Sequence, residues 1–98
     1  MSDGAADLDR TIHEPARLAI VSILAAAESA DFLYLLRETG LTKGNLSSHL
    51  SRLEDAGYVE IEKTYLGKKP HTVARLTAAG ESAFETYRRQ MRSLLDRR

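Results

Sequence analysis

The sequence contains no cysteine among its 98 residues. This absence excludes a disulfide framework, thiolate metal sites and cysteine catalysis together. No apolar run approaches the ~20 residues that span a bilayer, and the N-terminus lacks the charged-then-apolar layout of a signal peptide. We therefore expect a soluble, cytoplasmic protein without membrane contact, and the length predicts one domain.

The chain also lacks the residue patterns of a catalytic site. It has no Gly-rich phosphate loop and no pair of acidic residues in a setting that forms a pocket. Ser47 and Ser48 precede His49, but residues one or two apart on a helix point in different directions, so a nucleophile–base hydrogen bond is not expected. The three histidines are scattered and do not indicate a metal site. We expect neither an enzyme nor a cofactor.

The formal net charge is zero, which by itself gives no sign of a polyanionic partner. The charges are nevertheless unevenly distributed. Residues 1–40 carry three Lys or Arg against seven Asp or Glu, whereas residues 41–98 carry eleven against seven. The second part is therefore the basic one, and this asymmetry indicates a surface that could meet a nucleic acid.

The stretch from Leu41 to Val59 has the pattern on which the rest of the chain is organised. Thr42 stands where a helix N-cap is expected, and Gly57 stands where a left-handed C-terminal stop is expected. Between them, apolar residues at helical spacing form one buried stripe, namely Leu46, Leu50, Leu53 and Ala56. The pattern predicts a helix over about residues 42–56.

The opposite face of this helix is unusual for a surface helix because it carries small, hydrogen-bonding side chains. It consists of Gly44, Ser47, Ser48, Ser51 and Arg52, flanked by Asn45 and His49. Such side chains let a helix approach another molecule closely, as a helix in the DNA major groove must. His49 lies between the buried stripe and this face, so it contacts DNA or packs against the preceding helix.

The residues before this stretch predict two more helices. Pro15 suits the first turn of a helix over residues 16–27, and Asp31 is a plausible N-cap for a short second helix that Gly40 ends. Two helices joined by such a short, Gly-containing turn are typical of a helix-turn-helix. Residues 1–10 are small, acidic and polar, and we interpret them as a flexible tail, with Leu8 and Ile12 as the possible start of a short packing segment.

After residue 57 the pattern changes to strands. Residues 58–65 and 71–76 predict a hairpin with Lys68 and Lys69 at its tip, which is a wing over about residues 58–76. Thr77 then caps a helix over about residues 78–96 that is longer than so small a domain can cover. Its apolar stripe is core or dimer interface, and because of the helix length we assign it to the dimer interface: Phe84, Tyr87, Met91, Leu94 and Leu95.

These elements predict a mainly α fold with a β-hairpin wing: a winged helix-turn-helix over residues 11–98 with a long C-terminal dimerisation helix. Three segments, residues 14–20, 44–59 and 75–80, carry a resemblance to the winged-helix DNA-binding domain of MarR/ArsR-like transcriptional regulators. The resemblance is greatest to their short single-domain members. The thiolate motif of metal-sensing ArsR-like proteins is absent, and the wing has Gly-Lys-Lys-Pro where MarR-like proteins commonly have Asp-x-Arg.

The resemblance implies where DNA is bound. The residues expected to read bases are Asn45, Ser47, Ser48, His49 and Arg52, and those expected to hold the DNA backbone are Thr42, Lys43, Lys68, Lys69 and His71. The arginines of the last helix either follow DNA or form a solvated face. The family works as homodimers, so we expect a homodimeric, sequence-specific regulator that binds double-stranded DNA. The alternative is a winged-helix module that binds a protein and not DNA. A switch that responds to a small molecule in a pocket at the dimer interface is compatible with the first reading.

Overall fold

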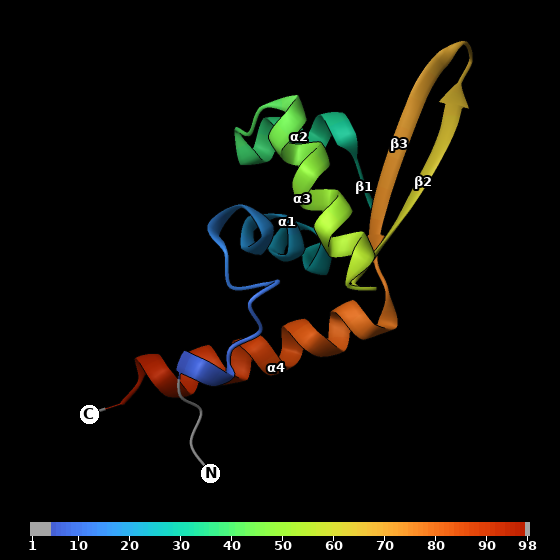
Figure 1. Ribbon diagram of the computed structural model, residues 1–98. Coiled ribbons are helices and arrows are strands. Elements are labelled where there is room, and N and C mark those ends of the chain that lie inside the picture. The colour runs from blue at the N-terminus through green and yellow to red at the C-terminus, as the bar shows by residue number, and fades with distance from the viewer. Residues whose placement is uncertain (1–4, 98) are drawn as a thin grey trace.

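The structure is a computed structural model that describes residues 5–97 (Figure 1). Three helices gather around the base of a sheet, a long hairpin projects from them, and a fourth helix runs along the opposite end. The elements are η1 (Ala5–Asp7), α1 (Pro15–Ala26), β1 (Ala30–Asp31), α2 (Phe32–Thr39), α3 (Lys43–Asp55), β2 (Val59–Leu66), β3 (Lys69–Leu76) and α4 (Ala78–Leu95). The predicted winged helix-turn-helix fold is confirmed.

Short polar side chains and glycines set the ends of the helix-turn-helix. Asp31 caps α2 by accepting the N–H of Tyr34 at 2.7 Å, and Thr42 caps α3 by accepting the N–H of Asn45 at 3.1 Å. Gly40 and Gly57 follow α2 and α3 with φ of 71° and 81°, a left-handed conformation that favours glycine. The turn between the two helices therefore has a defined geometry.

The sheet has the strand order β1-β3-β2 and is antiparallel throughout. The hairpin register pairs Leu66 with Lys69 at the tip and Val59 with Leu76 at the base. β1 adds a third strand by pairing Ala30 with Ala74. The sequence did not predict β1, because two residues are too short to show an alternating pattern.

The first three helices and the base of the sheet share one hydrophobic core. Its fully buried or nearly buried side chains come from every one of these elements and include Ile20, Leu24, Leu35, Leu46, Leu50, Leu53, Val59 and Ala74. Complete burial of one such aliphatic side chain stabilises the fold by about 1.5–3 kcal/mol. The inner stripe of α3 is thus fixed, and its opposite face is left to solvent.

Residues 5–10 are the described part of the segment predicted to be a flexible tail, and they lead into the packing segment that Leu8 and Ile12 were expected to begin. Leu8 and Ile12 are buried against Tyr87 of α4, and the side chain of Asp9 accepts the N–H of Thr11 at 2.9 Å. Asp9 also accepts the hydroxyl hydrogen of Tyr58. Leu8 and Ile12, four residues apart, thus pack this segment against α4. The first four residues lie outside the described part of the chain.

α4 begins in a tight junction with the wing. Thr77 caps the helix by accepting the N–H of Gly80 at 3.0 Å, and its own N–H donates to the carbonyl of Tyr58 at the same distance. A Cβ on Gly80 would lie 2.1 Å from that carbonyl oxygen, which is far inside van der Waals contact. Only glycine lets α4 start this close to the strand.

Candidate nucleic-acid interface

The outer face of α3 is open to solvent along its whole length. Asn45, Ser47, Ser48 and Arg52 are exposed, and Gly44 has no other atom within 4 Å of the place a Cβ would take. These side chains are free to hydrogen-bond to another molecule, since the helix is held by its opposite stripe. The structure therefore places four of the five predicted base-reading residues on one accessible surface.

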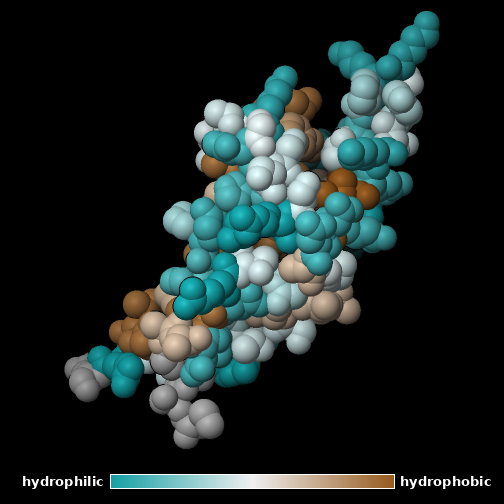
Figure 2. Space-filling model, in the orientation of Figure 1, coloured by the Kyte–Doolittle hydropathy of each residue, from teal (hydrophilic) through white to brown (hydrophobic). Residues whose placement is uncertain are grey.

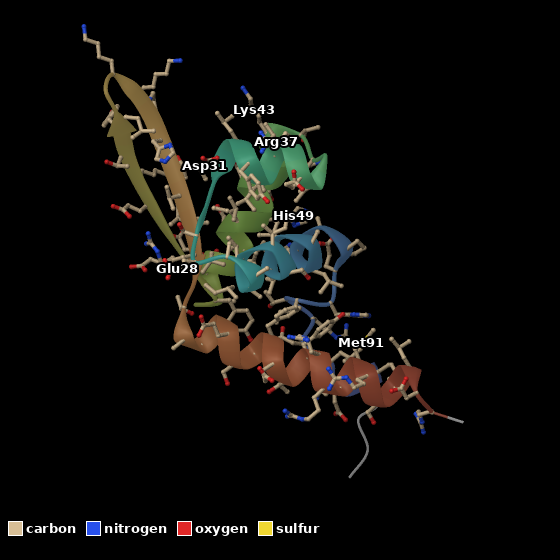
Figure 3. All side chains as sticks on the ribbon, turned by 180° about the vertical axis from the view of Figure 1, so that it is seen from behind. Glu28, Asp31, Arg37, Lys43, His49 and Met91 are labelled. Carbon is tan, nitrogen blue, oxygen red and sulfur yellow. The ribbon has the colours of Figure 1, made fainter. Side chains whose placement is uncertain are left out.

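The N-terminal end of α3 has the features of a phosphate contact. Lys43 is exposed and occupies the first helical position, where the positive end of the helix dipole lies. In Figure 3 it extends from the end of α3 away from the helices. Thr42 is exposed too, but its hydroxyl oxygen already accepts the N–H of Asn45, so it can offer a phosphate only its hydroxyl hydrogen.

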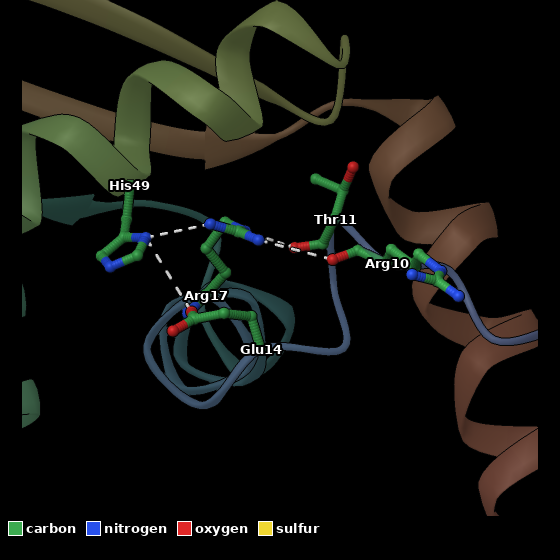
Figure 4. A network of polar contacts seen from close by, with 5 residues as sticks. All are labelled: Arg10, Thr11, Glu14, Arg17 and His49. Atoms are coloured by element: carbon green, nitrogen blue, oxygen red, sulfur yellow. Dashed lines mark hydrogen bonds and ion pairs between the residues drawn. The ribbon is translucent and has the colours of Figure 1, made fainter. Parts of the chain in front are cut away.

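His49 does not belong to this reading face. Its Nδ1 lies 3.1 Å from Nη1 of Arg17 and 3.8 Å from Oε1 of Glu14, so its side chain faces α1 (Figure 4). The prediction that His49 reads bases is corrected by these contacts. The alternative that His49 packs against the preceding helix, α2, is wrong as well, because the contacts of its ring are with Arg17 of α1 and with Glu14, which caps α1.

Arg17 is the centre of this contact. It is a buried cation whose Nε donates to the carbonyl of Thr11 and whose Nη2 donates to the carbonyl of Arg10 at 3.4 Å. An arginine has no acceptor, so Nδ1 of His49 accepts from Arg17 and the imidazole proton is on Nε2. The guanidinium of Arg17 thus joins the segment before α1 to α3. The residue types in the sequence did not predict this contact.

Glu14 completes the network by capping α1. Its Oε1 accepts the N–H of Arg17 at 2.8 Å. This hydrogen bond, with smaller contributions from the Arg17 guanidinium and, when its ring is protonated, from His49, lowers the pKa of Glu14 below its usual range, although burial opposes the change. The carboxylate therefore stays charged next to the two basic side chains at neutral pH.

A groove of about 600 Å³ separates α3 from the wing. Its floor is apolar, and its walls carry hydroxyls from α3 and polar side chains from the sheet; it is lined by Phe32, Ser47, Leu50, Ser51, Glu54, Ile61, Lys63 and Thr72. Lys63 and Thr72 form a cross-strand pair on the wall facing α3. The sequence reading missed these two residues, although the hairpin register could have placed them there.

The wing tip is the most projecting part of the protein. Lys68 and Lys69 are both exposed there, as predicted. Farther down the hairpin, Arg75 lies 3.6 Å from Glu60 and 3.3 Å from Glu62. Side chains alternate along a strand, so these two acids lie on the sheet face opposite Ile61 and Lys63. Most of the acidic charge of β2 therefore points away from α3.

His71 is half-buried and lies away from the lysines of the tip. It lines a hollow of about 350 Å³ together with Tyr34, Val73 and Asp31. A contact between His71 and DNA stays a prediction, but the side chain lies beside α2 and β1, which makes it a weaker candidate than Lys68.

The predicted dimer stripe of α4 divides into two parts. Tyr87 is buried within the chain by Leu8 and Ile12, and Nδ1 of His13 lies 2.8 Å from its hydroxyl. Tyr87 is therefore not available to a partner, which corrects that prediction. Beyond it, Leu95 is 72% exposed. Figure 2 shows hydrophobic side chains gathered at this end of α4, where Met91 and Leu94 are only partly covered, whereas Phe84 lies against the core.

None of the helices within residues 5–97 combines the length and the apolar character that a membrane span requires. Within the same residues, no three His, Asp or Glu side chains lie close enough together to hold a metal ion.

Comparison with known proteins identifies the family of the chain. Residues 16–95 match the family described as winged helix DNA-binding domain, and the chain belongs to this family. It is 37% identical over 71 residues to the uncharacterized protein MJ0432 of Methanocaldococcus jannaschii, covering 72% of this chain and 77% of that protein.

The fold is also shared with solved structures. A transcriptional regulator homologue from Pyrococcus horikoshii superposes with a TM-score of 0.83 at 28% identity, over 90% of this chain and 87% of that one. NadR in complex with 4-hydroxyphenylacetate has a TM-score of 0.74 at 24% identity, over 89% of this chain and 61% of that one, and shows the fold alone. The protein is a winged-helix DNA-binding regulator, and such regulators are not enzymes.

Proposed function

We propose that the protein is a sequence-specific regulator of transcription that binds double-stranded DNA as a homodimer and reads bases with α3. The observation that carries this proposal is the division of α3 into two faces. Leu46, Leu50 and Leu53 fix one face in the core, and the other presents only small or hydrogen-bonding side chains. A helix of this kind fits a major groove without a bulky side chain in the way.

The roles within α3 follow from side-chain chemistry. Arg52 can donate two hydrogen bonds to the N7 and O6 of a guanine, and Asn45 can pair with an adenine, each such contact giving about 1–3 kcal/mol of discrimination. Ser47 and Ser48 can donate to or accept from a base edge. Lys43 supports these contacts by holding a phosphate beside the helix N-terminus.

The homodimer rests on the far end of α4. A helix of 18 residues is about 27 Å long, and only its first part lies against the core. Met91, Leu94 and Leu95 form an apolar surface that a second copy could cover. A two-fold dimer of this shape predicts a pseudo-palindromic site whose half-sites are about one helical turn, ~34 Å, or a multiple of it, apart.

Selection of bound sequences from random DNA duplexes at two salt concentrations tests the proposal. We expect one enriched motif with two-fold symmetry. Arg52→Ala should lose the preference for one base position in each half-site, whereas Arg89→Ala, which removes an exposed arginine from α4, should keep the motif. No enrichment at either salt concentration would contradict the proposal and favour a module that binds a protein.

An effector stays a separate prediction, and the groove between α3 and the wing offers it a different place from the expected pocket at the dimer interface. The groove volume of about 600 Å³ lies in the range of small-molecule pockets, about 300–1,000 Å³. A ligand there would cover Ser47 and Ser51 and so compete with DNA. Binding of small aromatic carboxylates, measured by calorimetry with and without the selected duplex, tests this: competition is expected, and simultaneous binding would contradict it.

A further inference from the structure

The wing tip carries two large apolar side chains beside its lysines. Tyr65 is 68% exposed and Leu66 is 64% exposed, and they are neighbours at the end of β2. They face Pro70 and Lys69 across the hairpin, and the left-handed Gly67 turns the chain between the strands. No part of the core reaches this far along the hairpin, so the protomer itself leaves both side chains uncovered.

The two side chains point to opposite sides of the hairpin. Alternation along β2 places Tyr65 on the same face as Lys63, which lines the groove beside α3. Leu66 lies on the other face, together with Lys69. The tip therefore presents one apolar group on each side and positive charge at its end.

The charge on the tip indicates which partner covers these groups. Lys68 and Lys69 favour a polyanion over an apolar protein surface. The wing also borders the groove beside α3 and projects past that helix (Figure 1). We therefore take the tip to meet the neighbouring minor groove of a duplex whose major groove holds α3. The walls of a minor groove are deoxyribose rings, which offer C–H surface.

We propose that Tyr65 and Leu66 pack against the deoxyribose walls of the minor groove, one on each side of the inserted tip. This inference rests on the proposed function. A two-stranded tip with a side chain on each side is wider than the ~6 Å minor groove of B-DNA, so the groove must open to admit it. Binding then depends on how easily the sequence under the wing deforms, at positions where no base is contacted.

Salt dependence separates this apolar contact from the lysine contacts. We expect Leu66→Ala to weaken binding to the selected duplex about tenfold, because the variant no longer buries the aliphatic Leu66 side chain against the DNA. The slope of log affinity against log salt should stay unchanged, because no phosphate contact is lost. Lys69→Ala should instead lower that slope by about 0.9. Leu33→Ala is the matched control, because Leu33 is 67% exposed but lies on α2.

Hydroxyl-radical footprinting gives the position of the contact, because the radicals attack deoxyribose from the minor groove. Wild type and Leu33→Ala should protect the sugars flanking the α3 motif, and Leu66→Ala should lose that protection alone. If the wild type selects a motif but Leu66→Ala binds within twofold of Leu33→Ala, the inference is wrong and the proposed function stands. If the wild type binds no duplex, both are wrong.

Discussion

Nη1 of Arg17 lies 3.1 Å from Nδ1 of His49, and this contact decides how far the reading face of α3 extends. Because Nδ1 of His49 contacts Arg17 of α1, the face of α3 that we propose to read bases ends with Ser48 and Arg52. The recognition helix is held on this side by a hydrogen bond to a buried guanidinium, in addition to the apolar stripe on its inner side. A side chain that looks like a reader of bases therefore fixes the orientation of the helix.

We predict that His49→Ala lowers stability and leaves base preference intact. Arg17 would lose one acceptor while buried, which costs about 1–3 kcal/mol, or a fall of about 4–8 °C in melting temperature per kcal/mol. Thermal unfolding and motif selection measure the two effects. Arg52→Ala should behave in the opposite way, with unchanged melting and an altered motif. A changed motif for His49→Ala at unchanged stability would return His49 to the reading face.

Glu14→Gln should reduce stability in a pH-dependent way. The pKa of Glu14 is lowered in the folded protein from its ordinary value of 4.5, so its charge stabilises the fold above that value. This contribution is lost as pH falls through the lowered pKa. With the side chain one-third exposed, the expected difference at pH 7 is at most about 1 kcal/mol. Urea unfolding of the wild type and Glu14→Gln at pH 7 and pH 3.5 measures the difference in their free energies of unfolding. A difference that is larger at pH 3.5 than at pH 7 would contradict the prediction.

Gly80→Ala should destabilise the protein strongly. The new methyl group would lie 2.1 Å from the carbonyl oxygen of Tyr58, and the backbone would have to move, at a cost of about 1–3 kcal/mol or more. Gly44→Ala is the matched control, because it is also helical but has open space around it, and it should stabilise α3 by about 0.5–1 kcal/mol. Chemical denaturation measures the free energy of unfolding of both variants. If Gly80→Ala and Gly44→Ala changed it equally, the backbone around Gly80 and the Tyr58 carbonyl would have to relax without cost.

Leu95→Glu should weaken self-association. Leu95 is 72% exposed in the protomer, so a charge there costs little until a second copy covers it. Sedimentation equilibrium at micromolar concentration should show a dimer for wild type and a shift to monomer for the variant, with unchanged melting at high dilution. Leu33→Glu, an equally exposed change on α2, serves as the control. A monomeric wild type would remove α4 from the proposed dimer interface.

Local signals in the sequence predicted most of the fold. α3 was predicted to within one residue at each end because Thr42 and Gly57 mark its ends by local hydrogen bonding and backbone conformation. The wing was predicted because its turn and its β-branched residues are also local. Helical spacing also predicted which face of α3 is buried, and four of the five residues that the resemblance implies as base readers lie exposed outside that buried stripe.

Long-range contacts explain what the sequence reading missed. His49 lies between two faces of its helix, and its partner Arg17 is 32 residues away. Tyr87 was assigned to a dimer interface because the residues that cover it, Leu8 and Ile12, stand in a short polar segment without a periodic pattern. In both cases the deciding contact joins parts of the chain whose pairing no local pattern reports.

The packing of η1 on α4 has a practical consequence. Nε2 of Gln90 donates to the carbonyl of Asp7 at 3.4 Å, so both ends of the described chain lie beside α4, at the opposite end from the wing tip (Figure 1). A fluorescent protein attached through a flexible linker at either end would therefore stay clear of α3 and the wing. Attached labels can report binding without blocking the reading face.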